Sequence, residues 1–230
     1  MTTKTISGTL AIVSDTICPW CYVGKRRLAA ALPVLEAEGL TFDVKWLPYQ
    51  LNPNMPAGGL PRKAYRTAKF GSLEVSEAKD AQLTEVGAET GIGFRFDLME
   101  RTPNTMASHV MVADARRAGG SDLQDRAVEA LFKAYFEEGR DVGDMKVLRE
   151  IAREVGFIHT PMDDEALWGL VAEEELSLRF SGLTGVPSFL LNGHFLFSGA
   201  QPWDKLVLSL RDAVKGLPLP EEAPLIREIQ

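Results

Sequence analysis

The 230-residue sequence contains only two cysteines, Cys18 and Cys21, so a network of disulfide bonds cannot hold the fold together. No apolar run reaches the length of about 18 residues that a membrane-spanning helix needs. The 25 basic residues are outnumbered by 32 acidic ones. The resulting net charge of −7 argues against binding to nucleic acid, which requires a basic face. We therefore expect neither a membrane nor a nucleic acid as a partner.

A secretory signal is also missing from the start of the sequence. Residues 1–8 lack the basic stretch and the following apolar segment that such a signal needs. We therefore expect a cytoplasmic protein. Because the cytosol keeps thiols reduced, a closely spaced cysteine pair there is more often catalytic or metal-binding than structural.

The two cysteines form the motif Cys18-Pro19-Trp20-Cys21, between an apolar run at 10–13 and a helix-like stretch at 22–38. This order places them at a strand-to-helix junction, where the helix N-terminus stabilises a thiolate. One helical turn separates them, so their sulfurs can form a bond. We expect Cys18 to be the exposed attacking thiol and Cys21 the buried resolving thiol, with Pro19 and Trp20 tuning the pair.

Two other interpretations of the pair remain open. A structural disulfide between Cys18 and Cys21 would close too short a loop to constrain the unfolded chain much. The pair could also be half of a zinc site, which commonly takes four ligands as two spaced pairs. The sequence has no second Cys-x-x-Cys motif, although distant histidines can converge in a fold. We predict no metal.

The pattern along the chain predicts an α/β fold interrupted by helices. Short strands are expected at 10–14 and 42–47, on either side of a helix at 18–38, and the pattern is helical from 62 to about 156. A helix at 164–180, strands at 188–191 and 194–198, and a helix at 202–215 follow. Asn192-Gly193 between the last two strands is typical of a hairpin turn. We predict one α/β domain (1–60 with 161–230) split by an all-helical insertion at 61–160.

Two helix starts carry recognisable caps. Ser121 and Gln124 resemble a capping box, and Asp144 is placed to cap the helix that follows it. Asp15, three residues before Cys18, could relay protons to Cys21, although an acid at a strand end is more often a turn former.

Several segments together carry a family resemblance. They are 14–27 around the cysteine pair, Leu51-Asn52-Pro53, Pro103-Asn104-Thr105, Ser108-His109, 134–141, Thr184-Gly185-Val186-Pro187-Ser188-Phe189 and Ser198-Gly199-Ala200-Gln201-Pro202. The sequence resembles the DsbA-like thioredoxin-fold oxidoreductases, in particular the FrnE-like branch. The resemblance implies a thioredoxin fold that contains the helical insertion. It also implies a cis Val186–Pro187 bond beside the cysteines, with Val186 backbone groups free to pair with an extended substrate.

As an oxidoreductase, the protein is expected to act on protein disulfides or small thiols without a cofactor, with glutathione as a possible redox partner or co-substrate. Asn104 and His109 are expected at the edge of the cleft, facing the thiols and contacting substrate. In the alternative interpretation they are a helix cap and a packed histidine.

Three functional hypotheses follow. The first is a dithiol–disulfide oxidoreductase that acts through Cys18 and Cys21. The second is a glutathione-dependent isomerase or transferase of a small aromatic or polyketide-like molecule, because a related branch has serine where Cys18 stands and uses glutathione. The third is a partner-binding module that keeps the motif only for folding.

Overall fold

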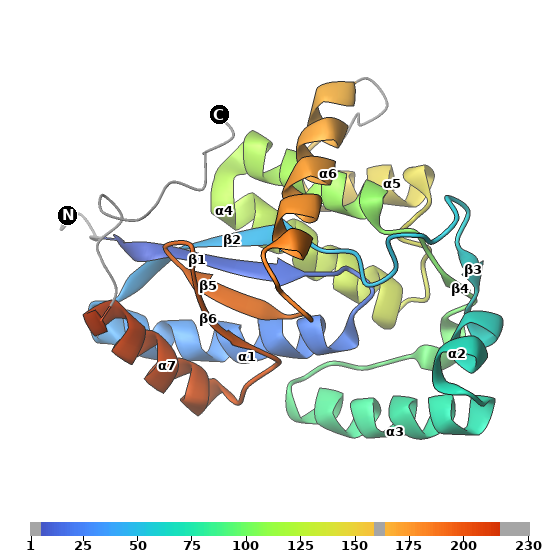
Figure 1. Ribbon diagram of the computed structural model, residues 1–230, viewed down its shortest axis with the longest axis horizontal. Coiled ribbons are helices and arrows are strands. Elements are labelled where there is room, and N and C mark those ends of the chain that lie inside the picture. The colour runs from blue at the N-terminus through green and yellow to red at the C-terminus, as the bar shows by residue number, and fades with distance from the viewer. Residues whose placement is uncertain (1–5, 159–163, 217–230) are drawn as a thin grey trace.

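The computed structural model describes residues 6–158 and 164–216, and its centre is a four-stranded mixed sheet (Figure 1). The spatial order is β2-β1-β5-β6, in which β1 runs parallel to β2 and antiparallel to β5, and β5 runs antiparallel to β6. The strand bounds are β1 Ile6–Ser14, β2 Thr41–Pro48, β5 Ser188–Leu191 and β6 His194–Ser198. Within the described residues, no helix is long and apolar enough to cross a membrane.

Both faces of β1 are buried, which explains its continuous apolar run. Leu10 and Ile12 belong to the large core, while Ala11 and Val13 point to the opposite face and join a smaller core with Leu178. The α/β class and the thioredoxin-type sheet predicted from the sequence are confirmed by this arrangement.

The hairpin of β5 and β6 forms where the sequence predicted it. Asn192 and Gly193 both have positive φ, 50° and 80°, as a two-residue turn between antiparallel strands requires.

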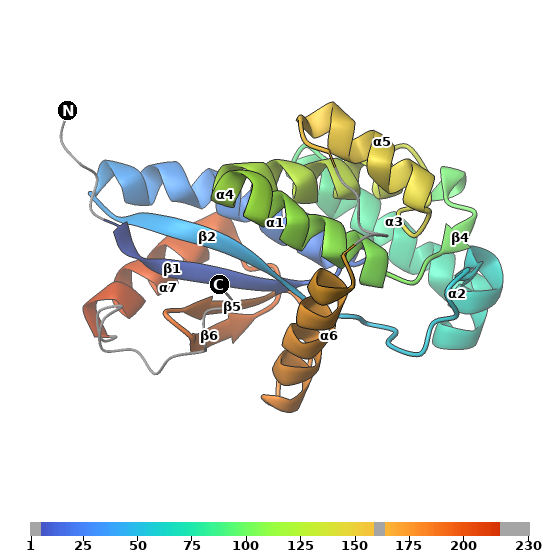
Figure 2. The same ribbon diagram turned by 90° about the horizontal axis from the view of Figure 1, so that it is seen from above.

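Helices cover the sheet on both sides (Figures 1 and 2). Helix α1 (Pro19–Ala37) packs with α7 (Trp203–Gly216) on one face, and α6 (Glu165–Phe180) contacts β2 on the other. Pro19 occupies the first turn of α1, where its missing N–H leaves no hydrogen bond unmade. Leu28, Ala31 and Leu35 recur at helical spacing and are buried, so one stripe of α1 anchors it to the core.

Helix α4 (Met106–Phe136) runs along the open edge of β2, where Gln124 takes the place of a neighbouring strand. The Gln124 side-chain amide accepts from the Trp46 N–H and donates to the Trp46 carbonyl, both at 3.0 Å. The capping-box interpretation was therefore wrong: Gln124 binds β2, and the Ser121 hydroxyl bonds Asp43. The break in α4 lies at Gly119 and Gly120, whose backbone is not helical.

The remaining helices form the predicted insertion. Helix α5 (Met145–Val155) packs on α4, and the Asp144 side chain caps it by accepting from the Lys146 N–H at 2.6 Å, as predicted. The chain also forms α2 (Arg62–Phe70), α3 (Leu73–Glu89), the short helix η1 (Phe96–Leu98) and a small sheet of β3 (Leu60–Pro61) and β4 (Arg101–Thr102). Figure 1 shows α2 and α3 beyond the end of the sheet where β1 finishes. The small sheet was not predicted, and the domain division at residues 60 and 161 stays a prediction.

Candidate functional site

The cysteine pair lies where β1 turns into α1. After Ser14 the chain makes a tight turn in which the Cys18 N–H donates to the Asp15 carbonyl at 3.0 Å. Cys18 is the N-cap of α1, and its carbonyl accepts from the Cys21 N–H at 3.0 Å. Cys18 therefore lies at the mouth of the helix, where the first N–H groups and the helix dipole favour a negative charge.

Both cysteines carry free thiols, and Cys18 is more buried than the sequence suggested. Cys21 is fully buried, as predicted, but Cys18 is only 5% exposed rather than an open surface thiol. Cys18 belongs to the large core cluster, which buries most of its surface, and it also lines a cavity. Access to the Cys18 sulfur is therefore through that cavity.

The environment of Cys21 keeps its thiol neutral. Burial raises the pKa of Cys21 well above its ordinary value, and a hydrogen bond and charge repulsion from Cys18 raise it further. Weaker hydrogen bonds from Ser14 and Asp15 act in the opposite direction. Cys21 is thus protonated at neutral pH and must lose a proton before it can attack another sulfur.

The pairing of β1 with β5 brings a distant segment beside the thiols. Val13 pairs with Ser188, so Val186 and Pro187 fall next to the turn that follows β1. The Cys18 sulfur lies 3.8 Å from the Val186 carbonyl oxygen, to which its S–H donates, and the Val186–Pro187 bond is cis as the resemblance implies. A β-carbon at Gly24 would lie 3.1 Å from the Pro187 ring, which shows how closely α1 approaches this loop.

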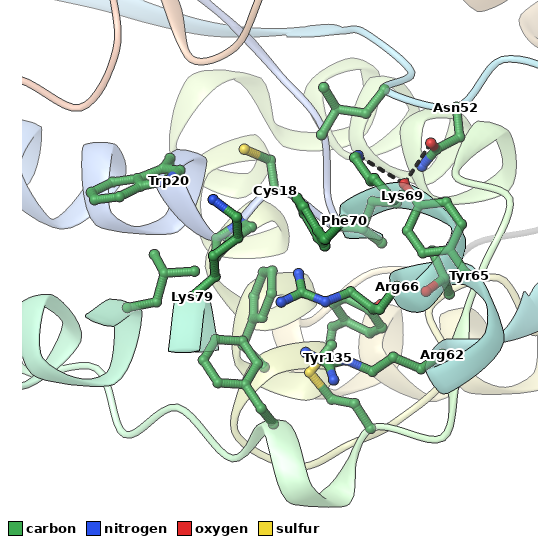
Figure 3. A pocket seen from close by; sticks show the side chains of 18 of the residues that line it. Cys18, Trp20, Asn52, Arg62, Tyr65, Arg66, Lys69, Phe70, Lys79 and Tyr135 are labelled. Carbon is green, nitrogen blue, oxygen red and sulfur yellow. Dashed lines mark hydrogen bonds between the residues drawn. The ribbon is translucent and has the colours of Figure 1, made fainter. Parts of the chain in front are cut away.

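A cavity of about 370 Å³ opens at the cysteine pair (Figure 3). Cys18, Pro19, Trp20 and Val186 all line it, so four of the predicted site residues meet in one place. Trp20 is 37% exposed and forms part of the rim. Pro187 is buried behind this wall and packs against α1.

Asn104 and His109 are not among the residues that line the cavity. The Asn104 side chain donates to the Met55 carbonyl at 2.7 Å and accepts from the Met106 N–H at 3.0 Å. The buried His109 ring places Nε2 3.2 Å from the Tyr49 carbonyl, and because a carbonyl only accepts, Nε2 carries the proton. Both side chains thus join the loop after β2 to α4, and their role in substrate binding stays a prediction.

The side chains of Asp15 and Thr16 form hydrogen bonds that stabilise the turn leading to Cys18. One Asp15 carboxylate oxygen accepts from the Leu51 N–H at 2.7 Å, and the Thr16 hydroxyl lies 2.7 Å from that of Ser108. The other Asp15 oxygen has no hydrogen-bond partner and lies 3.5 Å from His109 Nε2. Asp15 is therefore at least a turn former, and a proton relay to Cys21 stays a prediction.

The opposite wall of the cavity was not predicted from the sequence. It carries four cationic side chains, Arg62, Arg66 and Lys69 from α2 and Lys79 from α3. Their spacing held a signal, since positions 62, 66 and 69 lie on one face of a helix. Nothing in the sequence indicates that this face meets Cys18, because no local pattern sets the position of α2 against α1.

Known proteins share the fold of this chain. Residues 9–211 match the DSBA-like thioredoxin domain. The chain belongs to this family. A solved structure described as a probable DsbA oxidoreductase from Streptomyces coelicolor is 27% identical, with a TM-score of 0.77 over 95% of this chain and 92% of that chain.

More distant structures share the fold of this family. A 2-hydroxychromene-2-carboxylate isomerase is 15% identical, with a TM-score of 0.62 over 90% of this chain and 94% of that chain. The cytosolic disulfide reductase DsbM from Pseudomonas aeruginosa, solved with GSH, is 19% identical, with a TM-score of 0.61 over 90% of this chain and 99% of that chain. At these identities the likeness concerns the fold alone.

Proposed function

We propose that the protein is a dithiol–disulfide oxidoreductase that exchanges disulfides with protein or small thiol substrates through Cys18-Pro19-Trp20-Cys21. One observation carries the proposal. Two unbonded thiols lie one helical turn apart, and only Cys18 lines a cavity, while Cys21 is buried behind it. This difference in access is what an attacking thiol and a resolving thiol require. We place the activity in the cytosol and assign it no metal or organic cofactor.

The reduction of a substrate disulfide needs two exchange steps. The Cys18 thiolate attacks one substrate sulfur, the substrate S–S bond breaks, and one substrate thiolate leaves. Cys21 then loses its proton and attacks the Cys18 sulfur, which forms the Cys18–Cys21 bond and releases the second substrate thiolate. Two electrons pass from the cysteine pair to the substrate, and the reverse sequence oxidises a substrate dithiol.

The surrounding residues support each step in this scheme. The N-terminus of α1 stabilises the Cys18 thiolate, both when it attacks and when it leaves. The Val186 carbonyl, 3.8 Å from the Cys18 sulfur, is placed to accept from the backbone of an extended substrate. The raised pKa of Cys21 keeps this thiol from attacking before a mixed disulfide has formed.

Two single-cysteine variants test the proposal. In an insulin-reduction assay with dithiothreitol as electron donor, we expect catalysis by the wild type and only the uncatalysed rate with Cys18→Ser. Cys21→Ser should lose turnover but accumulate a mixed disulfide on Cys18 that mass spectrometry detects. Turnover by Cys18→Ser at the wild-type rate would rule the proposal out.

The walls of the cavity favour a second candidate, a glutathione-dependent isomerase or transferase of a small aromatic molecule. The aromatic rings of Trp20, Tyr65 and Phe70 line the cavity and could stack on a flat substrate. In that chemistry Cys18 would activate glutathione and Cys21 would be dispensable. The Cys21→Ser variant separates the two candidates: isomerase activity retained with added glutathione favours the second, and loss of disulfide exchange favours the first.

A further inference from the structure

The cavity beside Cys18 is strongly basic in a protein that is acidic as a whole. Among the residues that the structure describes, its lining includes Arg62, Arg66, Lys69 and Lys79 but no aspartate or glutamate, although the net charge of the chain is −7. In Figure 3 these four side chains extend into the same cavity as Cys18 and Trp20. An excess of cations confined to one concave wall raises the local concentration of anions.

The two arginines share a single carboxylate. Asp80 bonds Arg62 at 2.7 Å and Arg66 at 2.5 Å, and all three side chains are largely buried. Arg66 is also fixed by the Ser76 hydroxyl at 2.7 Å and the Ser76 carbonyl at 3.0 Å. Asp80 offsets only one of the two positive charges, so Arg62, Arg66 and Asp80 together keep a net charge of about +1. Their mutual bonds also limit how far the two guanidinium groups can move.

The two lysines add further positive charge to this wall. Within residues 6–158 and 164–216, neither Lys69 nor Lys79 forms an ion pair, and Lys69 donates to the Tyr65 hydroxyl at 2.8 Å instead. Both lysines lie over the ring of Phe70, at 5.9 Å and 5.3 Å from its centroid, and Arg66 lies over it at 4.6 Å. The ring attracts all three cations, but they repel one another, and a bound anion would relieve that repulsion.

The geometry points to a substrate class for the exchange reaction. We propose that the protein acts on small disulfides whose carbon skeleton carries at least two negative charges, as carboxylates or phosphates. The α2–α3 wall would hold the anionic groups while the S–S bond lies at Cys18 on the opposite wall. A cavity of about 370 Å³ is within the range for small-molecule ligands. This inference rests on the proposed function only in taking Cys18 as the thiol that meets the substrate.

The chemical step is a single thiol–disulfide exchange. The Cys18 thiolate attacks one sulfur of the anionic disulfide, that S–S bond breaks, and the leaving thiolate carries one of the acidic groups away. The cations of α2 and α3 bind the substrate before the step and are not consumed by it.

Cys18 can be followed alone, because the chain has only one other cysteine. In the full-length Cys21→Ser protein, we would measure the second-order rate of mixed-disulfide formation by mass spectrometry. The three reagents are 3,3′-dithiodipropionate, 2-hydroxyethyl disulfide and cystamine, which are anionic, neutral and cationic at similar size. Each rate is divided by the rate at which the same disulfide reacts with 2-mercaptoethanol. This ratio removes differences in intrinsic reactivity among the three disulfides.

We expect the normalised rate to be roughly a hundredfold higher for dithiodipropionate than for cystamine at low salt. At 1 M salt, where the screening length is about 3 Å, most of this preference should vanish. Adding Lys69→Gln and Lys79→Gln should reduce the preference by about tenfold, since both lysines are exposed and their loss spares the core. Lys63→Gln is the matched control: Lys63 is exposed on α2 but outside the cavity, and its replacement should leave the preference unchanged.

Equal normalised rates for the three reagents would overturn the inference, as would a preference that the loss of both lysines leaves undiminished. The proposed function is judged separately, by wild-type turnover of the neutral 2-hydroxyethyl disulfide with dithiothreitol. Turnover without a charge preference removes the inference alone, and a charge preference without turnover removes the function alone. At constant ionic strength, competition by inorganic pyrophosphate rather than by glutarate would assign the acidic groups as phosphates, and the reverse would assign them as carboxylates.

Discussion

The two walls of the cavity are built in different ways. The thiol wall belongs to α1, a helix with eight buried residues that is packed against α7 and the sheet. The cation wall belongs largely to α2, which has no buried residue, and to α3, which has three. Ion pairs to Asp80 and cation–ring contacts therefore hold the second wall, whereas burial of apolar side chains holds the first.

This difference separates two tasks of the site. Bond exchange between sulfurs requires fixed geometry, and the thiol wall obtains it from the core of the protein. Recognition of varied small disulfides tolerates some movement, and elements with few buried contacts open locally at low free-energy cost. We expect the α2–α3 region to open locally more often than the thiol wall. Two experiments compare the two walls directly, and a third examines the thiol wall alone.

The largest effect should come from the core beneath the thiol wall. Leu28 on α1 is 2% exposed, and Leu28→Ala should lower the free energy of unfolding by about 3 kcal/mol through lost transfer energy and a residual void. Val75→Ala on α3, where the side chain is 45% exposed, should change it by less than about 0.5 kcal/mol. Urea unfolding measures both, and similar losses for the two variants would contradict the contrast between the walls.

A smaller and more local effect is expected when the cation wall loses its carboxylate. Asp80→Asn leaves Arg62 and Arg66 without their shared partner and should destabilise α2 and α3 by about 2 kcal/mol, between the values for exposed and buried ion pairs. Hydrogen exchange followed by mass spectrometry should show faster exchange at 62–89 and unchanged exchange in α1. The exposed Glu77→Gln on α3 serves as the matched control and should leave both regions as they are.

The smallest effect is a pH dependence that arises from the thiol wall. The pKa of Cys21 is raised in the folded protein above the value of about 8.5 for an unfolded chain. Between these two values the unfolded chain has released the Cys21 proton and the folded chain still holds it. The free energy of unfolding of the reduced protein should thus be at its full value below pH of about 8.5 and fall above it, by up to about 1.4 kcal/mol per pH unit.

Cys21→Ala supplies the control for this measurement, because it keeps Cys18 and removes only the buried thiol. Between about pH 8 and 9.5, the free energy of unfolding of this variant should not show the fall that the raised pKa of Cys21 causes. The pKa values of Tyr22 and Tyr135 are raised as well, but their unfolded values lie near 10, above this window. If the free energy of unfolding changes with pH in the same way in both proteins, Cys21 does not contribute to the pH dependence of stability.

The sequence predicted the elements whose patterns are local. The cysteine motif, the Asn192-Gly193 turn and the Asp144 cap each depend on neighbouring residues, and the structure has them where they were predicted. Gln124 shows the limit of such patterns. The spacing from Ser121 suggested a helix start, but the side chain bonds the edge of a strand far away in the sequence.

The candidate site was predictable on its thiol side and not on its other side. The motif places Pro19 and Trp20 beside Cys18, and the family resemblance adds Val186. The cation wall depends on how the insertion folds back over α1, which is decided by contacts between segments distant in the sequence. The burial of Cys18 was not predicted either, because it depends on a core cluster to which segments distant in the sequence contribute.

The absence of a side chain at position 24 has a consequence for how this sequence can evolve. A methyl group at position 24 would lie 3.1 Å from the Pro187 ring, so α1 or the loop would have to give way by a few tenths of an ångström. The residues at positions 24 and 187 therefore constrain each other, although most of the chain lies between them. Larger residues at position 24 should be accommodated most readily when a change in the loop that carries residue 187 makes room for them.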